Sequence, residues 1–173
     1  MIHLYCGDGK GKTTAAMGLA LRMAGRDKGV LVVQFLKSSG SGERFALARL
    51  EQVTLLPLPD KVKFVRTMSP EEKEAEAARC RFLLSKSMDL LESGKNFGLL
   101  VLDEVCGAMT HGFLSRESVF ACLDLCERLG IEAVLTGRDP HPDLVGRCHY
   151  VTEMVKRKHP FDSGAAAREG VEF

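Results

Sequence analysis

Near its start the chain carries a glycine-rich loop, GDGKGKTT, at residues 7–14. An apolar and aromatic run at residues 2–5 precedes it and predicts a strand, whereas residues 13–24 predict a helix. Glycines let the backbone take positive φ and approach a ligand closely, so that successive N–H groups point at one anion. A strand that turns through such a loop into a helix is typical of a phosphate-binding P-loop. The sequence therefore predicts a nucleotide site at this turn.

Two side chains of the loop suit that chemistry, and its length is unusual. Lys12 would bring a positive charge to the phosphates, and Thr13 stands where such loops coordinate Mg²⁺. The alternative, a glycine-rich turn capped by a threonine, does not account for the lysine or for the strand-to-helix context. The standard pattern G-x-x-x-x-G-K-[ST] puts its first glycine at Cys6, but the chain has it at Gly7. The loop is one residue tighter than the consensus, so we expect the nucleotide to sit differently from its pose in an ordinary NTPase.

Composition narrows the class of protein. The 173 residues suit a single domain over 1–173, and 45% hydrophobic with 27% charged residues is ordinary for a soluble globular chain. Lys plus Arg number 24 against 23 Asp plus Glu, a net charge of +1, so no global field favours nucleic acid or a membrane surface. We find no signal segment and no apolar run of the roughly 18 residues that a membrane span needs. We therefore expect a cytoplasmic protein.

The six cysteines include no C-x-x-C pair. Cys122 and Cys126 fall one helical turn apart on an apolar face. Reduced and mostly buried thiols are favoured over metal ligands.

Apolar runs that alternate with helical patterns indicate the fold. Beyond residues 2–5, buried strands are predicted at 30–36, 53–56, 99–102, 133–135 and 149–151. Strands that alternate with helices predict an α/β fold with a mostly parallel sheet of about six strands and helices on both faces. In such sheets ligands bind outside the carboxyl ends of the strands.

The two longest helices have clear start and stop signals. The helix at 70–91 follows Ser69 as N-cap, has Pro70 at its first position and stops before Gly94. A second helix, at 116–129, follows Ser115 and ends at Gly130. Residues 38–42 are small and polar and suit a mobile loop near the ligand, and the tail after Val155 has little periodicity.

Two carboxylates, Asp103 and Glu104, follow the apolar strand at 99–102. Behind a phosphate loop this is the Walker B arrangement. Asp103 would reach Mg²⁺ through water or by way of Thr13, and Glu104 could bind the metal, the ribose or an attacking group. The alternative is a pair of solvated acids at a strand end, which the phosphate loop disfavours.

Arg138 follows the strand at 133–135 within the segment TGR. A guanidinium at the carboxyl edge of the sheet could clamp phosphate oxygens. We choose it as the second phosphate cation, although a surface arginine after a strand is also common.

Over nearly its whole length the chain resembles the CobA/BtuR-type ATP:corrinoid adenosyltransferases. Besides the loop and Ala15-Ala16, the resemblance is carried by VQFLK (33–37), GER (42–44), VLDE (101–104), LTGR (135–138), VTEM (151–154), KHPF (158–161) with Gly164, and GVE (170–172). The tight loop and the TGR and KHPF segments are typical of this family, and ordinary P-loop kinases do not share the two segments.

The resemblance implies a P-loop NTPase-like (RecA-type) fold and a specific reaction. The enzyme would transfer the 5'-deoxyadenosyl group of ATP to the cobalt(I) of a reduced corrinoid and release inorganic triphosphate, as a cob(I)yrinic acid a,c-diamide adenosyltransferase does. In the family ATP lies in the P-loop in the reverse sense to most NTPases. Cobalt attacks the ribose C5' directly, so the protein positions C5' and neutralises the leaving triphosphate.

The resemblance also assigns roles by position. Lys12, Arg138 and Glu104 would act in catalysis, and Thr13, Asp103 and Glu104 would hold Mg²⁺. Asp8 and Glu104 would lie close to the ribose and the metal, and Arg22, on the first helix, is a candidate for the adenine side. The cofactor-binding residues would be Gly7, Asp8, Gly9, Lys10, Gly11, Lys12, Thr13, Thr14, Arg22, Phe64 and Arg66.

On the corrinoid side the chain departs from the family pattern. Family members exclude the lower axial ligand with aromatics that wedge under the ring, and the matching stretch here is residues 63–68. It keeps Phe64 but has Arg66 where many members carry tryptophan, and the chain has no tryptophan at all. We also expect the N-terminal extension that covers the site in some members to be missing, because the first strand starts at Ile2. Both departures bear on corrinoid affinity and on the displacement of the lower ligand, not on ATP binding.

The resemblance further implies a homodimer and a flavoprotein-type reductase that supplies the electron. Two other functions stay open: a small-molecule P-loop kinase, and a corrinoid-binding or delivery protein in which ATP only switches conformation. The kinase leaves the TGR and KHPF segments unexplained.

Overall fold

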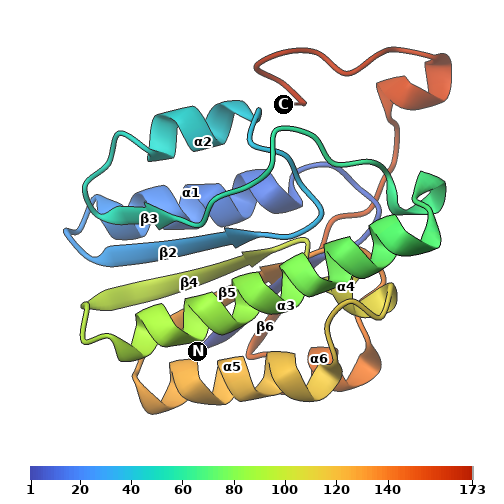
Figure 1. Cartoon of the computed structure of the whole chain (residues 1–173). Coiled ribbons are helices and arrows are strands. Elements are labelled where there is room, and N and C mark those ends of the chain that lie inside the picture. The colour runs from blue at the N-terminus through green and yellow to red at the C-terminus, as the bar shows by residue number, and fades with distance from the viewer. Residues whose placement is uncertain (173) are drawn as a thin grey trace.

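The architecture is a six-stranded parallel sheet between two layers of helices (Figure 1). This computed structural model describes residues 1–172 apart from the side chain of Phe161, so the phenylalanine of the KHPF segment lies outside the described side chains. In spatial order the strands are β3 (Val53–Leu55), β2 (Gly29–Gln34), β4 (Phe97–Asp103), β5 (Glu132–Thr136), β1 (Ile2–Cys6) and β6 (Tyr150–Glu153). Every neighbouring pair is parallel, which confirms the predicted α/β sheet.

Helices cover both faces of the sheet, as predicted (Figure 1). On one face lie α1 (Lys12–Ala24) and α2 (Gly42–Leu47), and on the other lie α3 (Pro70–Glu92), α4 (Val105–Thr110), α5 (Arg116–Arg128) and α6 (Pro142–Arg147). Two short 3-10 helices complete the chain, η1 (Val65–Thr67) and η2 (Pro160–Ser163).

The core is divided by the sheet into two apolar layers. Successive side chains of a strand point to opposite faces, and in β4 Leu100 and Leu102 join the layer under α3 and α5, whereas Leu99 and Val101 join the layer under α1. All four are fully buried. Because both faces are covered, the strand has a continuous apolar sequence instead of an alternating one.

The start signals of the longest helix act as the sequence predicts. The Ser69 hydroxyl accepts from the Glu72 N–H at 3.2 Å, and the Glu72 carboxylate accepts from the Ser69 N–H at 2.9 Å. This capping box, with Pro70 at the first position, satisfies two backbone donors that the helix itself leaves free.

Several boundaries differ from the sequence prediction. The strand predicted at 30–36 ends at Gln34, because Leu36 takes a left-handed conformation with φ 56° and turns the chain toward the carboxyl edge. The last strand covers Tyr150–Glu153 instead of 149–151. The helices α2, α4 and α6 have six residues each, too few for a periodic signal. Gly42, predicted as loop, begins α2.

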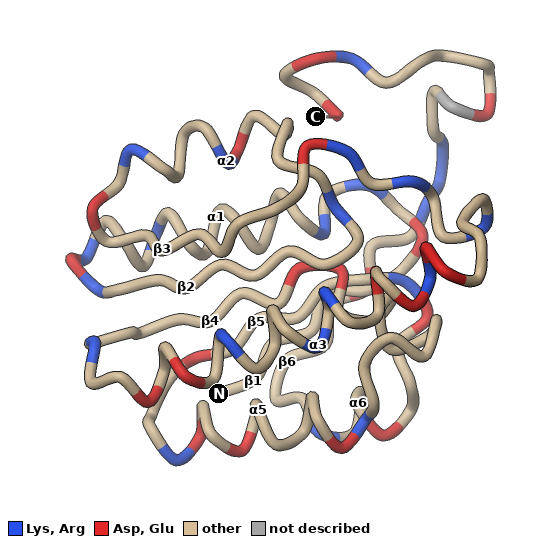
Figure 2. The backbone as a smooth tube through the Cα atoms, viewed as in Figure 1, with Lys and Arg blue, Asp and Glu red and all other residues tan. Residues whose placement is uncertain are grey.

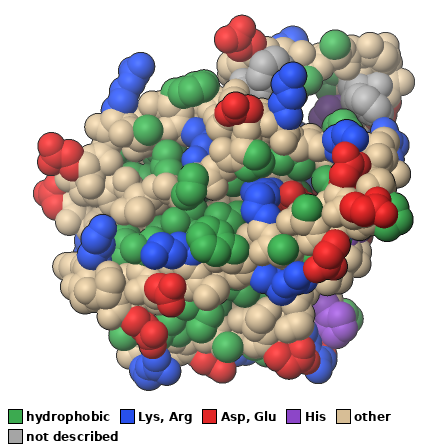
Figure 3. Space-filling model, in the orientation of Figure 1, with side chains coloured by type: hydrophobic (Ala, Val, Ile, Leu, Met, Phe, Trp, Pro, Cys, Tyr) green, Lys and Arg blue, Asp and Glu red, His purple; other side chains and the backbone are tan. Residues whose placement is uncertain are grey.

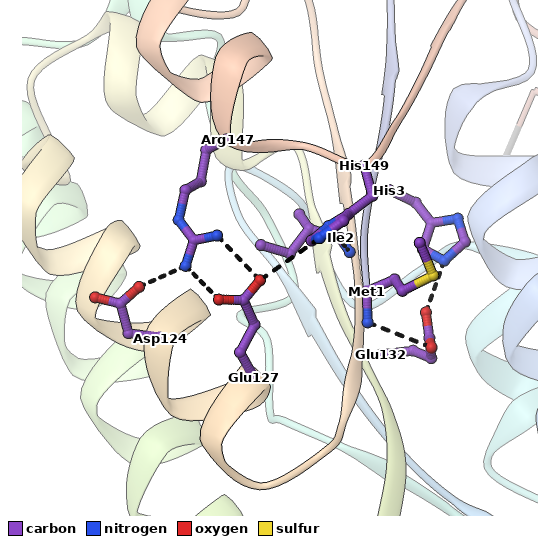
Figure 4. Close-up of polar contacts among 8 residues, drawn as sticks. All are labelled: Met1, Ile2, His3, Asp124, Glu127, Glu132, Arg147 and His149. Carbon is purple, nitrogen blue, oxygen red and sulfur yellow. Dashed lines mark hydrogen bonds and ion pairs between the residues drawn. The ribbon is translucent and has the colours of Figure 1, made fainter.

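The edge strand β6 is exposed along its length, and polar side chains anchor the residues before it (Figure 4). The buried Ile2 N–H donates to His149 Nδ1 at 3.0 Å. Arg147 donates to both Glu127 and Asp124, and its bond to Glu127 lowers the pKa of that carboxyl. These contacts tie the start of β6 to β1 and α5 at the amino ends of the strands.

Five of the six cysteines are buried, Cys148 is half-buried, and all six thiols are free. Burial raises the pKa of Cys80 and of Cys106 to about 12. The prediction of reduced, mostly buried thiols is confirmed. Within residues 1–172 we find no helix with the length and apolarity to cross a membrane.

We predict that His149→Ala lowers the free energy of unfolding by about 1 kcal/mol, because the buried Ile2 N–H loses its acceptor. Urea unfolding monitored by circular dichroism measures the change. His111→Ala, at an exposed position after α4, is the control and should change stability by less than about 0.5 kcal/mol. Equal stability of His149→Ala and the wild type would contradict the anchoring role.

Candidate functional site

A cleft of about 1100 Å³ lies at the carboxyl edge of the sheet. Its walls come from four parts of the chain: residues 8–14, residues 36–43 with Val62, the ends of β4 and β5 at Glu104 and Arg138, and the tail at His159 and 170–172. Acidic positions at the end of β4 have basic positions in the loops around them (Figure 2). Over the face shown in space-filling form, by contrast, acidic and basic side chains are interspersed (Figure 3).

The phosphate loop joins β1 to α1 and packs against the chain that leaves β6. Gly7 and Gly11 take φ of 100° and 115°, values that glycine adopts without strain. A Cβ on Gly7 or Gly9 would lie 2.5 or 2.6 Å from the Met154 carbonyl oxygen, so neither position has room for a side chain. The Gly9 N–H donates to that same oxygen at 2.6 Å. One amide of the compact loop is thus already engaged within the protein.

The charged residues of the loop are held by nearby groups. Asp8 accepts from the Lys156 N–H at 2.9 Å, which lowers the pKa of Asp8. Lys12 Nζ donates to the Gly9 carbonyl at 2.7 Å, and desolvation and the charge of Arg138 lower the pKa of Lys12. Two cations therefore share one side of the cleft. Lys10 points instead to the tail, where Nζ lies 2.8 Å from a Glu172 carboxylate oxygen.

Asp103, at the end of β4, is completely buried and is the centre of a hydrogen-bond network. One carboxylate oxygen accepts from Thr13 Oγ1 at 2.9 Å and from Thr136 Oγ1 at 2.6 Å. The other accepts from Gln34 Nε2 at 3.1 Å and from Lys37 Nζ at 2.6 Å. Burial alone raises the pKa of Asp103, but the Lys37 charge and these hydrogen bonds outweigh it and hold the pKa below its ordinary value.

Glu104, the next residue, has the opposite electrostatic environment. Its backbone is left-handed, with φ 60°, and its N–H donates to Thr136 Oγ1 at 2.8 Å. Burial and the adjacent Asp103 charge raise the pKa of Glu104. The two neighbouring carboxyls thus have pKa values shifted apart, a pattern that is common at functional sites.

Arg138 reaches the cleft from the end of β5. The preceding Gly137 has φ 150°, and a Cβ there would lie 2.5 Å from the Cβ of Cys106 on α4. Glycine therefore lets α4 pack directly against the turn that carries the exposed Arg138 side chain.

The structure brings most of the predicted residues together. Lining the cleft are Asp8, Gly9, Lys10, Gly11, Lys12, Thr13, Thr14, Glu104 and Arg138, while the buried Asp103 lies behind Thr13. Gly7 does not line the cleft, but its φ of 100° shapes the turn from β1 into the loop. These positions agree with a shared site, and the role of each side chain stays a prediction.

Three predicted residues lie elsewhere. Arg22 is exposed on α1 nine residues beyond Thr13, roughly 13 Å along the helix, and does not line this cleft. Phe64 is 76% exposed, and its ring lies 5.7 Å from the Arg66 guanidinium carbon. A neighbouring cleft of about 730 Å³ is lined by residues on both sides of this pair, among them Lys63 and Met68, and shares Ser38 and Val62 with the first cleft.

Sequence reasoning did not assign roles to Gln34, Lys37, Arg44 or Thr136. Gln34 and Arg44 are buried, and Arg44 donates to Gln34 Oε1 at 2.8 Å and to the Leu56 carbonyl at 2.9 Å. Gln34 and Thr136 could have been found by the signal that identified Asp103, namely a polar residue at the end of an apolar strand.

The donor set at Asp103 fits Mg²⁺. Carboxylate and hydroxyl oxygens are the hard ligands that this ion prefers, and Thr13 and Asp103 present them 2.9 Å apart with Glu104 beside them. The Lys37 ammonium, between Thr13 Oγ1 and Asp103 Oδ2, shows that this position attracts a cation.

We predict that Asp103 makes stability depend on acid pH. Because the folded pKa lies below the unfolded value of about 4, the ionised carboxylate stabilises the protein above that pH, and this stabilisation is lost as the pH falls through the folded pKa. The stability difference between wild type and Asp103→Asn should therefore be constant near neutral pH and shrink below about pH 4. Urea titrations at several pH values test this, and a difference that does not shrink before acid unfolding would contradict it.

Comparison with known proteins finds similarity over the whole chain. The chain matches the family described as ATP:corrinoid adenosyltransferase BtuR/CobO/CobP over residues 1–173. It is 33% identical to the corrinoid adenosyltransferase of Pseudomonas aeruginosa, covering all of this chain and 83% of the relative. It is 33% identical to corrinoid adenosyltransferase CobA of Salmonella typhimurium and 32% identical to that of Escherichia coli K12, covering 85% of each.

Proposed function

Because this chain belongs to the ATP:corrinoid adenosyltransferase family, we propose that the cleft described above is where it transfers adenosyl from ATP to a corrinoid. The observation that carries the assignment is that the phosphate loop, the acidic end of β4 and Arg138 form one cleft. In the reaction a cobalt–carbon bond forms at C5' as the C5'–O bond breaks. The electron pair of that bond leaves on inorganic triphosphate.

The protein's main task is to stabilise negative charge on the leaving triphosphate. Lys12 and Arg138 line the same cleft, and Arg138 is close enough to lower the pKa of Lys12, so an anion between them would relieve their repulsion. Backbone amides of residues 10–13 add donors at the start of α1. Lys12, now on the Gly9 carbonyl, would turn to the phosphates.

Magnesium would be held by Thr13 and Asp103 with Glu104 beside them, and when bound it supplies positive charge to the triphosphate. Burial and the neighbouring Asp103 charge raise the pKa of Glu104, so a cation at this point would stabilise its ionised form. Asp8, near the start of the phosphate loop, lies on the side of the cleft that we assign to the ribose.

The compact loop supports a nucleotide pose unlike that of ordinary NTPases. Its Gly9 N–H donates to the Met154 carbonyl oxygen and is therefore not free to bind a phosphate. The tail at 170–172 also forms a wall of the cleft, tied to Lys10 through Glu172. As the family resemblance implies, ATP would lie under this wall in the reverse sense to most NTPases. We assign Arg22, on α1, to the adenine side.

The corrinoid would approach from the neighbouring cleft beside residues 59–68. That cleft adjoins the nucleotide cleft at Ser38 and Val62, which suits a large substrate whose cobalt must reach C5'. Phe64 offers an exposed ring for the underside of the macrocycle, and Arg66 stacks on it where the family pattern has an aromatic. We further propose that the protein is a cytoplasmic homodimer and that a flavoprotein-type reductase supplies the electron for the cobalt.

The reaction is tested by its stoichiometry. With ATP, Mg²⁺ and chemically reduced corrinoid, we expect adenosylcorrinoid and triphosphate in equal amounts. Lys12→Ala should lower turnover by about 100-fold or more because a charge on the leaving group is lost, and Lys86→Ala on the exposed face of α3 is the matched control. Release of ADP or phosphate without an adenosylated cobalt would instead favour a kinase, and corrinoid binding without adenosylation would favour a delivery protein.

The corrinoid assignment has its own test. Phe64→Ala removes an exposed ring beside the second cleft and should raise KM for the corrinoid about tenfold, while KM for ATP stays unchanged. Phe82→Ala, at a 61% exposed ring on α3 that lines neither cleft, is the control. Parallel rises in both KM values, or none, would refute the placement.

A further inference from the structure

Lys37 lies at the centre of the site. Its Nζ is 2.8 Å from Thr13 Oγ1 and 2.6 Å from Asp103 Oδ2. The side chain is 26% exposed, whereas the Asp103 carboxylate is completely buried. The ammonium thus neutralises a buried charge from the cleft side.

The backbone is shaped to place this lysine. β2 ends at Gln34, and Leu36 then takes a left-handed conformation, φ 56°, that residues with a Cβ rarely adopt. The turn sends Lys37 back over the carboxyl ends of β2 and β4, next to Asp103. Strain of this kind persists where surrounding contacts fix the conformation, and it is frequent at functional sites.

The ammonium uses the oxygens that a metal ion would need. It donates to Thr13 Oγ1, whose own hydrogen is directed to the other Asp103 oxygen at 2.9 Å. It also donates to Asp103 Oδ2, which accepts from Gln34 as well. Lysine and a divalent cation cannot both hold this position, because they would compete for the same lone pairs and repel each other.

We propose that Lys37 is an internal cation that occupies the magnesium position of the nucleotide-free protein and leaves it for the triphosphate when the metal and ATP bind. The inference rests on the proposed nucleotide site. Lys37 lines the same cleft as Lys12, Thr13 and Arg138, and its flexible four-carbon stem lets the ammonium move from Asp103 to a phosphate oxygen. It would position the metal and triphosphate relative to each other.

This exchange makes metal binding conditional on the anion. Without triphosphate, Mg²⁺ must displace the ammonium from Asp103, its ion-pair partner at 2.6 Å. With triphosphate present, the ammonium gains another anionic partner and the Asp103 and Thr13 oxygens become free. The protein therefore keeps its buried carboxylate neutralised at all times and takes up metal only together with the nucleotide.

The test measures binding of the metal alone. Lys37→Met keeps the length of the side chain and removes its charge, so Mg²⁺ or the spectroscopic probe Mn²⁺, without nucleotide, should bind at least tenfold more tightly than to the wild type. Mg²⁺ alone should also raise the melting temperature of Lys37→Met and leave that of the wild type unchanged. Titration calorimetry and Mn²⁺ paramagnetic resonance provide the affinities.

Three variants distinguish this exchange from a general effect of removing a lysine charge. Lys37→Arg keeps the charge and should behave as the wild type toward the metal alone. Lys86→Met, on the exposed face of α3, removes a lysine charge far from the cleft and should change nothing. The double variant Lys37→Met/Asp103→Asn lacks both charges and should lose the gained metal affinity, because the gain depends on the freed carboxylate.

Wild-type protein offers a second measurement in case Lys37→Met does not fold. With ¹⁵N-labelled lysine, the Lys37 ammonium signal, assigned by its loss in Lys37→Arg, should shift with Mg²⁺ plus inorganic triphosphate and stay unchanged with Mg²⁺ alone. A shift with Mg²⁺ alone, or equal metal affinity of wild type and Lys37→Met, would overturn the inference while metal–ATP binding stands. Failure of the wild type to bind Mg²⁺ with ATP would instead reject the proposed site itself.

Discussion

The buried carboxylate of Asp103 is the interaction on which the architecture of the site depends. It accepts hydrogen bonds from Thr13 on α1, Thr136 on β5, and Gln34 and Lys37 at the end of β2. A fully buried charge is costly unless it is paired and hydrogen-bonded, and here the partners come from three places at the carboxyl edge: the start of α1, the end of β2 with the turn after it, and the end of β5. The same contacts that satisfy the charge therefore fix the phosphate loop, the acidic strand and the β5 turn in one arrangement.

Local signals made much of the fold predictable. The glycine loop, the N-cap at Ser69 and the continuous apolar strands each depend on neighbouring residues, and the structure has each of them where the sequence indicates. Asp103 and Glu104 were also found because they follow a strand directly. The Leu36 turn carries no sequence signal, since leucine is not a residue that favours positive φ, and the predicted strand there ended two residues too late.

The remaining site residues depend on the order of the strands. Gln34, Asp103 and Thr136 are separated by 69 and 33 residues along the chain, and they meet only because β2, β4 and β5 are neighbours in the sheet. The contact between Lys10 and Glu172 spans 162 residues. Alternating strands and helices predict a parallel sheet but leave the order of its strands open, so the sequence could supply a list of candidates without their contacts.

The compact loop links this arrangement to the use of ATP. Because the Gly9 amide is bound to Met154, the loop differs from an ordinary phosphate cradle by one donor, and the charges of Lys12, Lys37 and Arg138 face the same cleft. In the proposed reaction cobalt attacks the ribose carbon C5', and triphosphate is the leaving group. ATP carrying ¹⁸O at the 5' bridging oxygen tests this most directly. If cobalt attacks C5', all of the label leaves in triphosphate; label retained on the adenosine part, with cleavage between phosphorus and oxygen, would contradict the proposed reaction.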